Sequence, residues 1–180
     1  MYEDRPASVV KSILHRSLLT WWQRSRKESS CPAPACLLDE QIQDLLPDCL
    51  IYEVSHPPKG PIFVAKFQGK VAFRLFGREV VDTAMVDHVN PEIFSGVIEP
   101  YRMAVERRRP VLTIRYCKDK DGAPLAIETL RFPLADGDAP VRNILVHYCL
   151  ISTANRFDFF ALKVIGNLPD NSVKAIISTI

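Results

Sequence analysis

Two Asp-Gly pairs, Asp121-Gly122 and Asp136-Gly137, constrain the fold of this chain more than any other feature of its sequence. Asp-Gly between apolar runs is typical of a β-hairpin turn, because glycine adopts a positive φ without a Cβ clash and aspartate tolerates it. The runs that the two pairs separate, 111–118, 124–134 and 141–151, are long and rich in β-branched residues. The pattern therefore predicts three consecutive antiparallel strands.

Two more strands and several short helices are predicted before these three strands. Residues 49–54 and 62–67 alternate along the chain as strands do. After them the two-residue period disappears, which predicts helices at 70–76, ended by Gly77, and at 79–88. Asn90-Pro91-Glu92 predicts the start of a longer helix, and Pro100 predicts a kink or a restart within it.

The two ends of the chain lie outside this core of predicted elements. Residues 7–27 are predicted to form a helix with an apolar stripe, made of Val10, Ile13, Leu14, Leu18 and Trp21. A linker with two prolines follows at 29–36, and Asp39 is predicted to cap a short helix before the first strand. Residues 157–165 fit a helix or a strand, and a last helix is predicted after Asn171-Ser172. These segments divide the chain into 1–37, 38–152 and 153–180.

Composition narrows the class of protein. A chain of 180 residues that is 47% hydrophobic and 24% charged fits one globular domain with appendages. A net charge of +2 is too small to indicate a nucleic-acid surface. The sequence contains neither an apolar run long enough to span a membrane nor the layout of a secretory signal. Its five cysteines are an odd number and do not fit a framework of paired disulfides. We therefore expect a cytoplasmic protein without a membrane span or a nucleic-acid partner.

The order of the predicted elements resembles the PAS-domain family, in particular its stand-alone bacterial members of the alphaproteobacterial type. The resemblance covers about residues 38–152. It rests on Leu45-Leu46-Pro47, on Arg74-Leu75-Phe76-Gly77-Arg78, and on Leu130-Arg131-Phe132-Pro133-Leu134 followed by an acidic turn and a last strand. It implies an α+β fold, with a five-stranded antiparallel sheet and short helices on one face. It also implies a sensory or protein-interaction module with a pocket between sheet and helices, but no particular ligand.

The cofactors of known PAS proteins are disfavoured by the residues present. A flavin photoreceptor of this class needs a cysteine on the central helices, and residues 77–82 contain none. Members that bind haem supply a histidine from the long central helix, whereas His88 lies just before that helix. Cys31 and Cys36 lack the second pair of ligands that zinc requires. We expect neither a flavin adduct, nor haem, nor a metal, and the cofactor is left unassigned.

A ligand pocket is predicted from the aromatic and apolar residues expected to face the helices. These candidates are Phe63, Phe67, Phe73, Val97, Tyr101, Ile114, Tyr116, Ile127 and Leu145. The alternative is that the same side chains fill the core and leave no room. Among them, Tyr101 and Tyr116 carry phenols that can orient a ligand. His147 on the last strand fits either a structural role or a ligand-binding or pH-sensing one.

The predicted function is regulatory and non-enzymatic. The sequence lacks catalytic motifs, and the acid–base candidates Glu53, Asp82, Asp87, His88 and Glu128 have no recognisable spacing. Leaving the apolar stripe of residues 7–27 in water would forgo several kcal/mol, at about 1.5–3 kcal/mol per large side chain. Either the chain's own sheet or the same helix of a second subunit covers it. The sequence thus favours a signalling module that acts through a homodimer and other signalling proteins; the alternative is a receptor for an apolar or aromatic metabolite.

Overall fold

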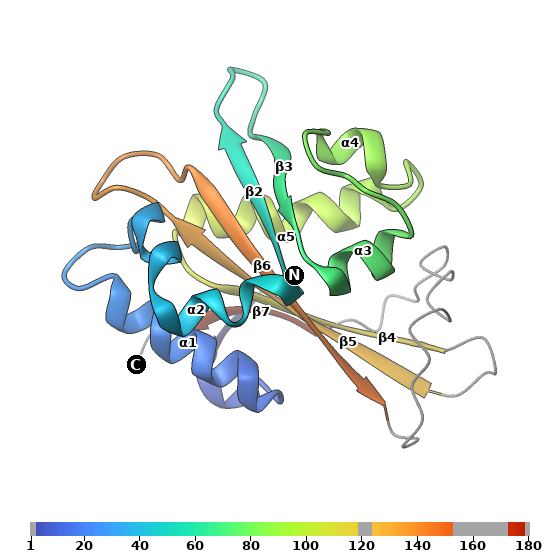
Figure 1. Ribbon diagram of the computed structural model, residues 1–180, viewed down its shortest axis with the longest axis horizontal. Helices are drawn as coiled ribbons and strands as arrows, with labels where there is room; N and C mark the ends of the chain where they lie inside the picture. The colour runs from blue at the N-terminus through green and yellow to red at the C-terminus, as the bar shows by residue number, and fades with distance from the viewer. Residues whose placement is uncertain (1–2, 119–123, 153–172, 179–180) are drawn as a thin grey trace.

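The computed structural model describes residues 3–118, 124–152 and 173–178, which are built around one sheet (Figure 1). Within these residues the sheet has seven strands in the order β1-β7-β4-β5-β6-β2-β3. The strands are β1 (Glu3–Pro6), β2 (Cys49–Ser55), β3 (Ile62–Gln68), β4 (Val111–Lys118), β5 (Pro124–Leu134), β6 (Asn143–Ser152) and β7 (Val173–Ser178).

The predicted five-stranded antiparallel sheet is confirmed as the part β4-β5-β6-β2-β3. The last strand of the meander, β6, pairs with β2, so the first two strands and the last three form one sheet. Gly137 has a φ of 58°, and the Ala139 N–H donates to the Asp136 carbonyl at 3.0 Å, which confirms the turn predicted there. The Asp121-Gly122 pair lies outside the described residues.

The α-helices of the described residues are α1 (Ile13–Ser25), α2 (Glu40–Gln43), α3 (Lys70–Phe76), α4 (Met85–His88) and α5 (Phe94–Arg107), and short 3-10 turns lie at Ala7–Val9, Pro34–Leu38 and Leu46–Asp48. Two predicted ends are confirmed, because Asp39 caps α2 and α3 ends at Gly77 with a φ of 67°. Asn90 accepts from the Glu92 N–H at 2.9 Å, but regular helix begins only at Phe94 and continues through Pro100.

Two helices are shorter than predicted because tertiary hydrogen bonds hold the preceding residues in other conformations. Residues 79–84 are not helical: the Ala65 N–H donates to the Thr83 carbonyl, and the Asp82 N–H donates back to Ala65. This exchange covers part of the open edge of β3. The first helix begins at Ile13 and not at residue 7, with Ser12 as its cap, because the Lys11 and Ser12 N–H groups donate to a side chain of β5.

The helix predicted near the C-terminus is wrong for residues 173–178, which form β7. This strand pairs antiparallel with β4 and parallel with β1. Its β-branched residues Val173, Ile176 and Ile177 favour a strand, and the edge of β4 provides the partner. Residues 157–165 lie outside the described part of the chain.

Helices cover both faces of the sheet. α1 packs on the face that carries Glu128 and His147, which we call the outer face. α5 packs on the opposite, inner face, where Arg131 lies over the Tyr101 ring. In Figure 1, α5 crosses behind β2 and β6, whereas α1 and α2 lie at the lower left. Because successive residues of a strand point to opposite faces, Glu128 and Thr129 belong to different layers of the core.

Candidate functional site

The helix α1 is fixed to the outer face by apolar packing and by one hydrogen bond. Leu18, Leu19 and Trp22 are buried, and Trp22 is fully covered. The Trp22 Nε1–H donates to the Pro133 carbonyl of β5 at 2.9 Å. The chain's own sheet therefore covers most of the apolar side of this helix.

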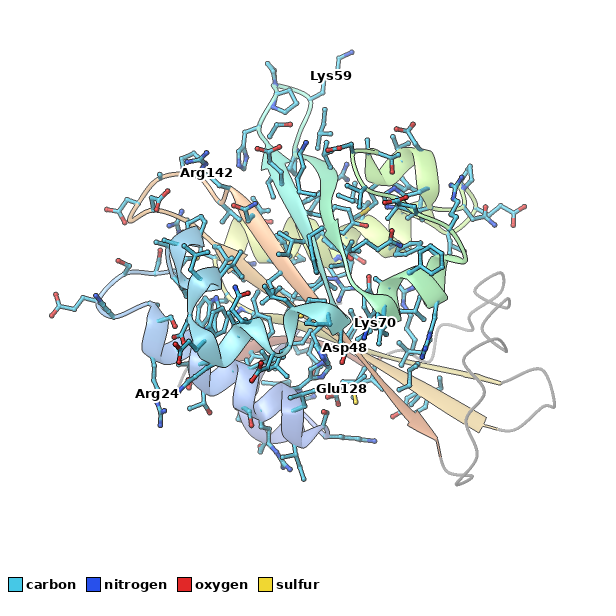
Figure 2. All side chains as sticks on the ribbon, in the orientation of Figure 1. Arg24, Asp48, Lys59, Lys70, Glu128 and Arg142 are labelled. Atoms are coloured by element: carbon cyan, nitrogen blue, oxygen red, sulfur yellow. The ribbon has the colours of Figure 1, made fainter. Side chains whose placement is uncertain are left out.

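A buried acidic side chain of β5 receives the N-terminal end of this helix. Glu128 accepts from the Lys11 N–H at 2.9 Å and from the Ser12 N–H at 3.1 Å. The third contact is the shortest, with His15 Nδ1 at 2.6 Å from Glu128 Oε1, and both side chains are completely buried. In Figure 2, Glu128 lies beside α1, whereas Arg24 projects from the other end of the helix into solvent.

His147 of β6 extends this contact into a chain of three side chains. Its Nδ1 lies 2.8 Å from His15 Nε2, and the two imidazole rings meet edge to face at 4.9 Å. The other nitrogen of His147, Nε2, is buried and has no hydrogen-bond partner among the described residues. We refer to Glu128, His15 and His147 as the outer cluster.

The pKa values of two members of the outer cluster, Glu128 and His147, are shifted. Burial raises the pKa of Glu128. The hydrogen bonds that the carboxylate accepts from His15 and from the Lys11 N–H lower it, and the resulting pKa lies below its usual value. Burial lowers the pKa of His147 to about 3, and positive charge on His15 contributes. We therefore assign an ionised Glu128 and a neutral His147, with the His15 ring held between them by hydrogen bonds.

A second chain of hydrogen bonds lies on the inner face. The Tyr52 hydroxyl is 2.9 Å from His88 Nε2, and Thr83 Oγ1 is 2.9 Å from His88 Nδ1. Burial lowers the pKa of His88, and the nearby Arg78 lowers it further. Both ring nitrogens of His88 are thus occupied by protein groups, which leaves no free nitrogen for a haem iron.

Arg131 occupies the middle of the inner face. It is 3% exposed, and its guanidinium lies 4.6 Å from the centre of the Tyr101 ring. Its Nη1 donates to Thr113 Oγ1 at 3.0 Å. Tyr52 packs edge to face against Tyr101 at 5.4 Å, and the register places Tyr148 on the same face, where burial and Tyr101 raise its pKa. Arg131, Tyr52, Tyr101, Tyr148 and His88 form what we call the inner cluster.

The predicted pocket residues are divided between the two faces. Phe63 and Tyr101 are buried together on the inner face, with ring centres 5.5 Å apart. The register also places Ile127 there, and Val97 packs against the core from α5. The register places Ile114, Tyr116 and Leu145 on the outer face, apart from Phe63 and Tyr101. Phe67 and Phe73 are exposed at 37% and 50%.

The predicted interface residues of the N-terminal helix are mostly covered within the chain. Val10, Leu18 and Trp21 are buried, and Leu14 is half-buried. Ile13 alone of the five is exposed, at 75%. The sequence left two candidates for covering this stripe, the chain's own sheet and the helix of a second subunit. In this structure, the chain's own sheet covers most of it.

The acid–base residues named from the sequence do not meet in one site. Glu53 and Asp82 lie on the surface around Lys66, at 3.8 and 2.9 Å from its Nζ. Glu128 and His88 are on opposite faces of the sheet. Within the described residues, groups of three or more His, Cys, Asp or Glu side chains arranged so that they could hold a metal ion are absent. The helices of the same part of the chain are all too short or too polar to span a membrane.

Sequence reasoning missed the partnership of His15 with Glu128 and the burial of Arg131. The first two residues are 113 positions apart and lie on a helix and a strand, so no local spacing connects them. The signal that was available is a charged residue within an otherwise apolar strand, which applies to both Glu128 and Arg131. A charge at such a position is buried at a cost, and it is kept where it has a partner or a function.

No family model matches this chain, and no curated protein matches it. Among solved structures, a light-oxygen-voltage domain studied with a flavin analogue is similar at 21% identity over 64% of this chain and 85% of that one, with a TM-score of 0.44. Vibrio cholerae VqmA is similar at 14% identity over 63% of this chain and 51% of its own, with a TM-score of 0.46. An RNA-binding light-oxygen-voltage receptor is 16% identical over 64% of this chain and 33% of its own, with a TM-score of 0.39. Similarities of this size assign no function or ligand to this chain.

Proposed function

We propose that this chain is a non-enzymatic, cytoplasmic signalling module of the PAS type, which acts through protein docking, and that α1 is the element that changes position. The observation that carries this proposal is the outer cluster, in which a buried contact of 2.6 Å between His15 and Glu128 joins α1 to β5. Apolar packing alone would cover the sheet as well, because polar groups are costly to bury. The buried polar contact adds specificity, since it fixes one docked position of the helix.

Release of α1 would expose a large apolar surface. Leu112, Leu130, Phe132 and Leu145 are fully buried on the outer face, beneath α1 and the segments next to it. A contiguous patch of this kind is typical of a protein-docking surface. The proposed signalling event is therefore an exchange, in which α1 leaves the outer face and a segment of a partner takes its place.

A homodimer is part of the same proposal. The apolar stripe of α1 is already covered within one chain, so two chains would associate by exchanging their N-terminal segments. Such an exchange keeps every contact of the outer cluster and replaces an intrachain contact with an interchain one.

Hydrogen exchange tests the proposed movement directly. We expect the amides of α1 to exchange through a local opening that costs less free energy than the opening of β5 and β6. Glu128→Gln should lower the free energy of this local opening and leave the protection of β3 and α5 unchanged. Protection of α1 equal to that of the central strands, in both proteins, would show that the helix is a fixed part of the domain and would contradict the proposal.

A truncation tests the role of the helix in association. Without residues 1–30, the outer face is uncovered, and we expect light scattering to show either a monomer or an aggregating domain. A truncated protein that forms a stable dimer would show that association does not depend on α1.

A second function, a small-molecule receptor, is favoured by the inner cluster. Tyr52, Tyr101 and Tyr148 bring phenols together between the sheet and α5, and such groups orient ligands in largely apolar sites. Native mass spectrometry of freshly purified protein should then show a bound small molecule. A protein with no associated mass, and with no thermal shift for any compound of a metabolite panel, would contradict this function.

A further inference from the structure

The inner cluster contains a buried positive charge for which the described residues provide no negative one. Arg131 is 3% exposed, and within the described part of the chain it contacts the Thr113 hydroxyl, the Thr129 carbonyl at 3.5 Å and the Tyr101 ring. The ion pairs formed within the described part of the chain do not include it. Its Nε–H is buried and has no hydrogen-bond partner among the described residues. A cation in this state is costly, because burial removes water without supplying a compensating charge.

The neighbouring phenols do not supply the missing charge. Burial raises the pKa of Tyr52 and of Tyr148 well above the usual value, so both stay neutral at physiological pH. Glu128, on the same strand, lies on the other face of the sheet and is paired with His15. The compensating anion must therefore come from outside the described residues.

We propose that Arg131 is the binding centre for the carboxylate of a small organic acid, held between the sheet and α5. This inference rests on the receptor function proposed above and names the class of ligand. A guanidinium offers donors in a planar fork that matches a carboxylate, and the Nε–H is one arm of that fork. The surrounding rings of Tyr52, Phe63 and Tyr101 favour an aromatic or apolar body on the ligand.

The charge of the cluster selects a carboxylate over a phosphate. Arg131 is the one fully buried arginine among the described residues, and burial lowers the pKa of His88 and keeps this imidazole neutral. Arg115, on the same face, is only partly buried and donates to the Gly96 carbonyl of α5. One carboxylate neutralises one guanidinium, whereas a phosphate monoester carries about −1.5 to −2 charges and would leave negative charge buried. The protein therefore fits a monoanion, and the three tyrosines provide neutral hydrogen-bonding groups around it.

The binding test uses the full chain and four probes at matched ionic strength: acetate, benzoate, benzamide and phenyl phosphate. We expect benzoate to raise the thermal midpoint with increasing concentration, as a ligand of the folded state does. Acetate should act more weakly because it lacks the ring, and benzamide and phenyl phosphate should have little effect. Equal shifts with benzoate and benzamide would overturn the proposal while leaving the receptor function intact. No shift with any probe would overturn the proposal, and it would also count against the receptor function.

Variants assign the effect to the residue. Arg131→Met should weaken the apparent affinity for benzoate at least tenfold, and Arg131→Lys, which keeps the charge without the fork, should weaken it less. Arg24→Met on the exposed side of α1 is the matched control and should bind as the parent protein does. An Arg131→Met protein that retains the benzoate shift would overturn the proposal.

A measurement on the unmodified protein covers the case in which these variants do not fold. The Nε–H of Arg131 has its own resonance in a nitrogen-15 NMR spectrum, and benzoate should shift it more than benzamide does. An Nε–H resonance that is unchanged at benzoate concentrations saturating the thermal shift would place the binding elsewhere and overturn the proposal.

Discussion

The two buried clusters lie on opposite faces of the same strands and differ in how their charges are balanced. In the outer cluster, Glu128 is surrounded by donors and paired with His15. In the inner cluster, Arg131 has neutral neighbours and an unpartnered Nε–H. A balanced pair depends on both members, whereas an unbalanced charge lowers stability until a ligand arrives. The outer face thus holds a segment of the chain, whereas the inner face carries a charge that the described residues leave without a partner.

The largest expected effect comes from breaking the balanced cluster. Glu128→Ala leaves the His15 ring and two backbone N–H groups buried without an acceptor. We expect a loss of about 3–5 kcal/mol in the free energy of unfolding, the range for removing one member of a buried pair. Urea denaturation measures this change.

The control for this variant removes the whole cluster. The triple variant Glu128→Leu, His15→Leu, His147→Leu leaves no unpaired charge, and it should recover most of the stability lost in Glu128→Ala. If Glu128→Ala costs less than about 1 kcal/mol, the outer cluster does not hold α1 in the way proposed here.

The second-largest effect is expected from acid, which should weaken the outer cluster. His147 has a pKa of about 3 in the folded protein, below its usual value, so between pH 6.5 and 3 only the unfolded chain takes up this proton. Stability therefore falls as the pH is lowered through this window, by about 1.4 kcal/mol per pH unit from this group. Between pH 6.5 and 4.5 we expect a loss of roughly 2–3 kcal/mol. Below its usual pKa, Glu128 adds to the loss, because its folded pKa is lowered as well.

Replacement of His147 separates its contribution from that of the other titrating groups. His147→Gln should flatten the pH dependence between pH 6.5 and 4.5, although it also destabilises the protein at neutral pH. Thr20→Ala, on the exposed side of α1, should keep the slope of the parent protein. An unchanged slope in His147→Gln would mean that His147 is not buried in the neutral form.

Removal of the charge should change the stability of the protein much less in the inner cluster than in the outer cluster. Arg131→Met removes a hydrogen bond to Thr113 and a contact with the Tyr101 ring, but it also removes an uncompensated buried cation. These contributions oppose each other, and we expect the free energy of unfolding to stay within about 1 kcal/mol of the parent value. A loss of about 3 kcal/mol or more, comparable to that of Glu128→Ala, would show that Arg131 is balanced inside the chain after all.

The sequence predicted the parts of this fold that depend on local chemistry. The turn at Asp136-Gly137, the end of α3 at Gly77 and the cap at Asp39 each follow from the conformation or the hydrogen bonds of one residue. The order of strands and helices, and with it the five-stranded sheet, could be predicted for the same reason.

The parts that could not be predicted depend on distant partners. Residues 173–178 have the spacing of a helix and become a strand because the edge of β4 is available. Residues 79–84 leave the helical conformation to pair with β3. The candidate site shows the same limit: Tyr101 was predicted on the inner face, whereas Ile114 and Leu145 lie on the other one, because the pairing register decides the face.

The smallest effect is expected at the one residue of the predicted interface that solvent reaches. Ile13 is 75% exposed on α1, so Ile13→Ser removes little packing and should change the free energy of unfolding by less than about 0.5 kcal/mol. Leu18→Ala, one turn further along and buried against the sheet, should cost about 2–5 kcal/mol. Light scattering of both variants then distinguishes two ways of associating. If chains associate by exchanging α1, Ile13→Ser keeps the oligomeric state, because the exchanged helix buries Leu18 and not Ile13. Dissociation of an oligomer by Ile13→Ser would instead place the exposed side of α1 in a contact between intact, unexchanged chains.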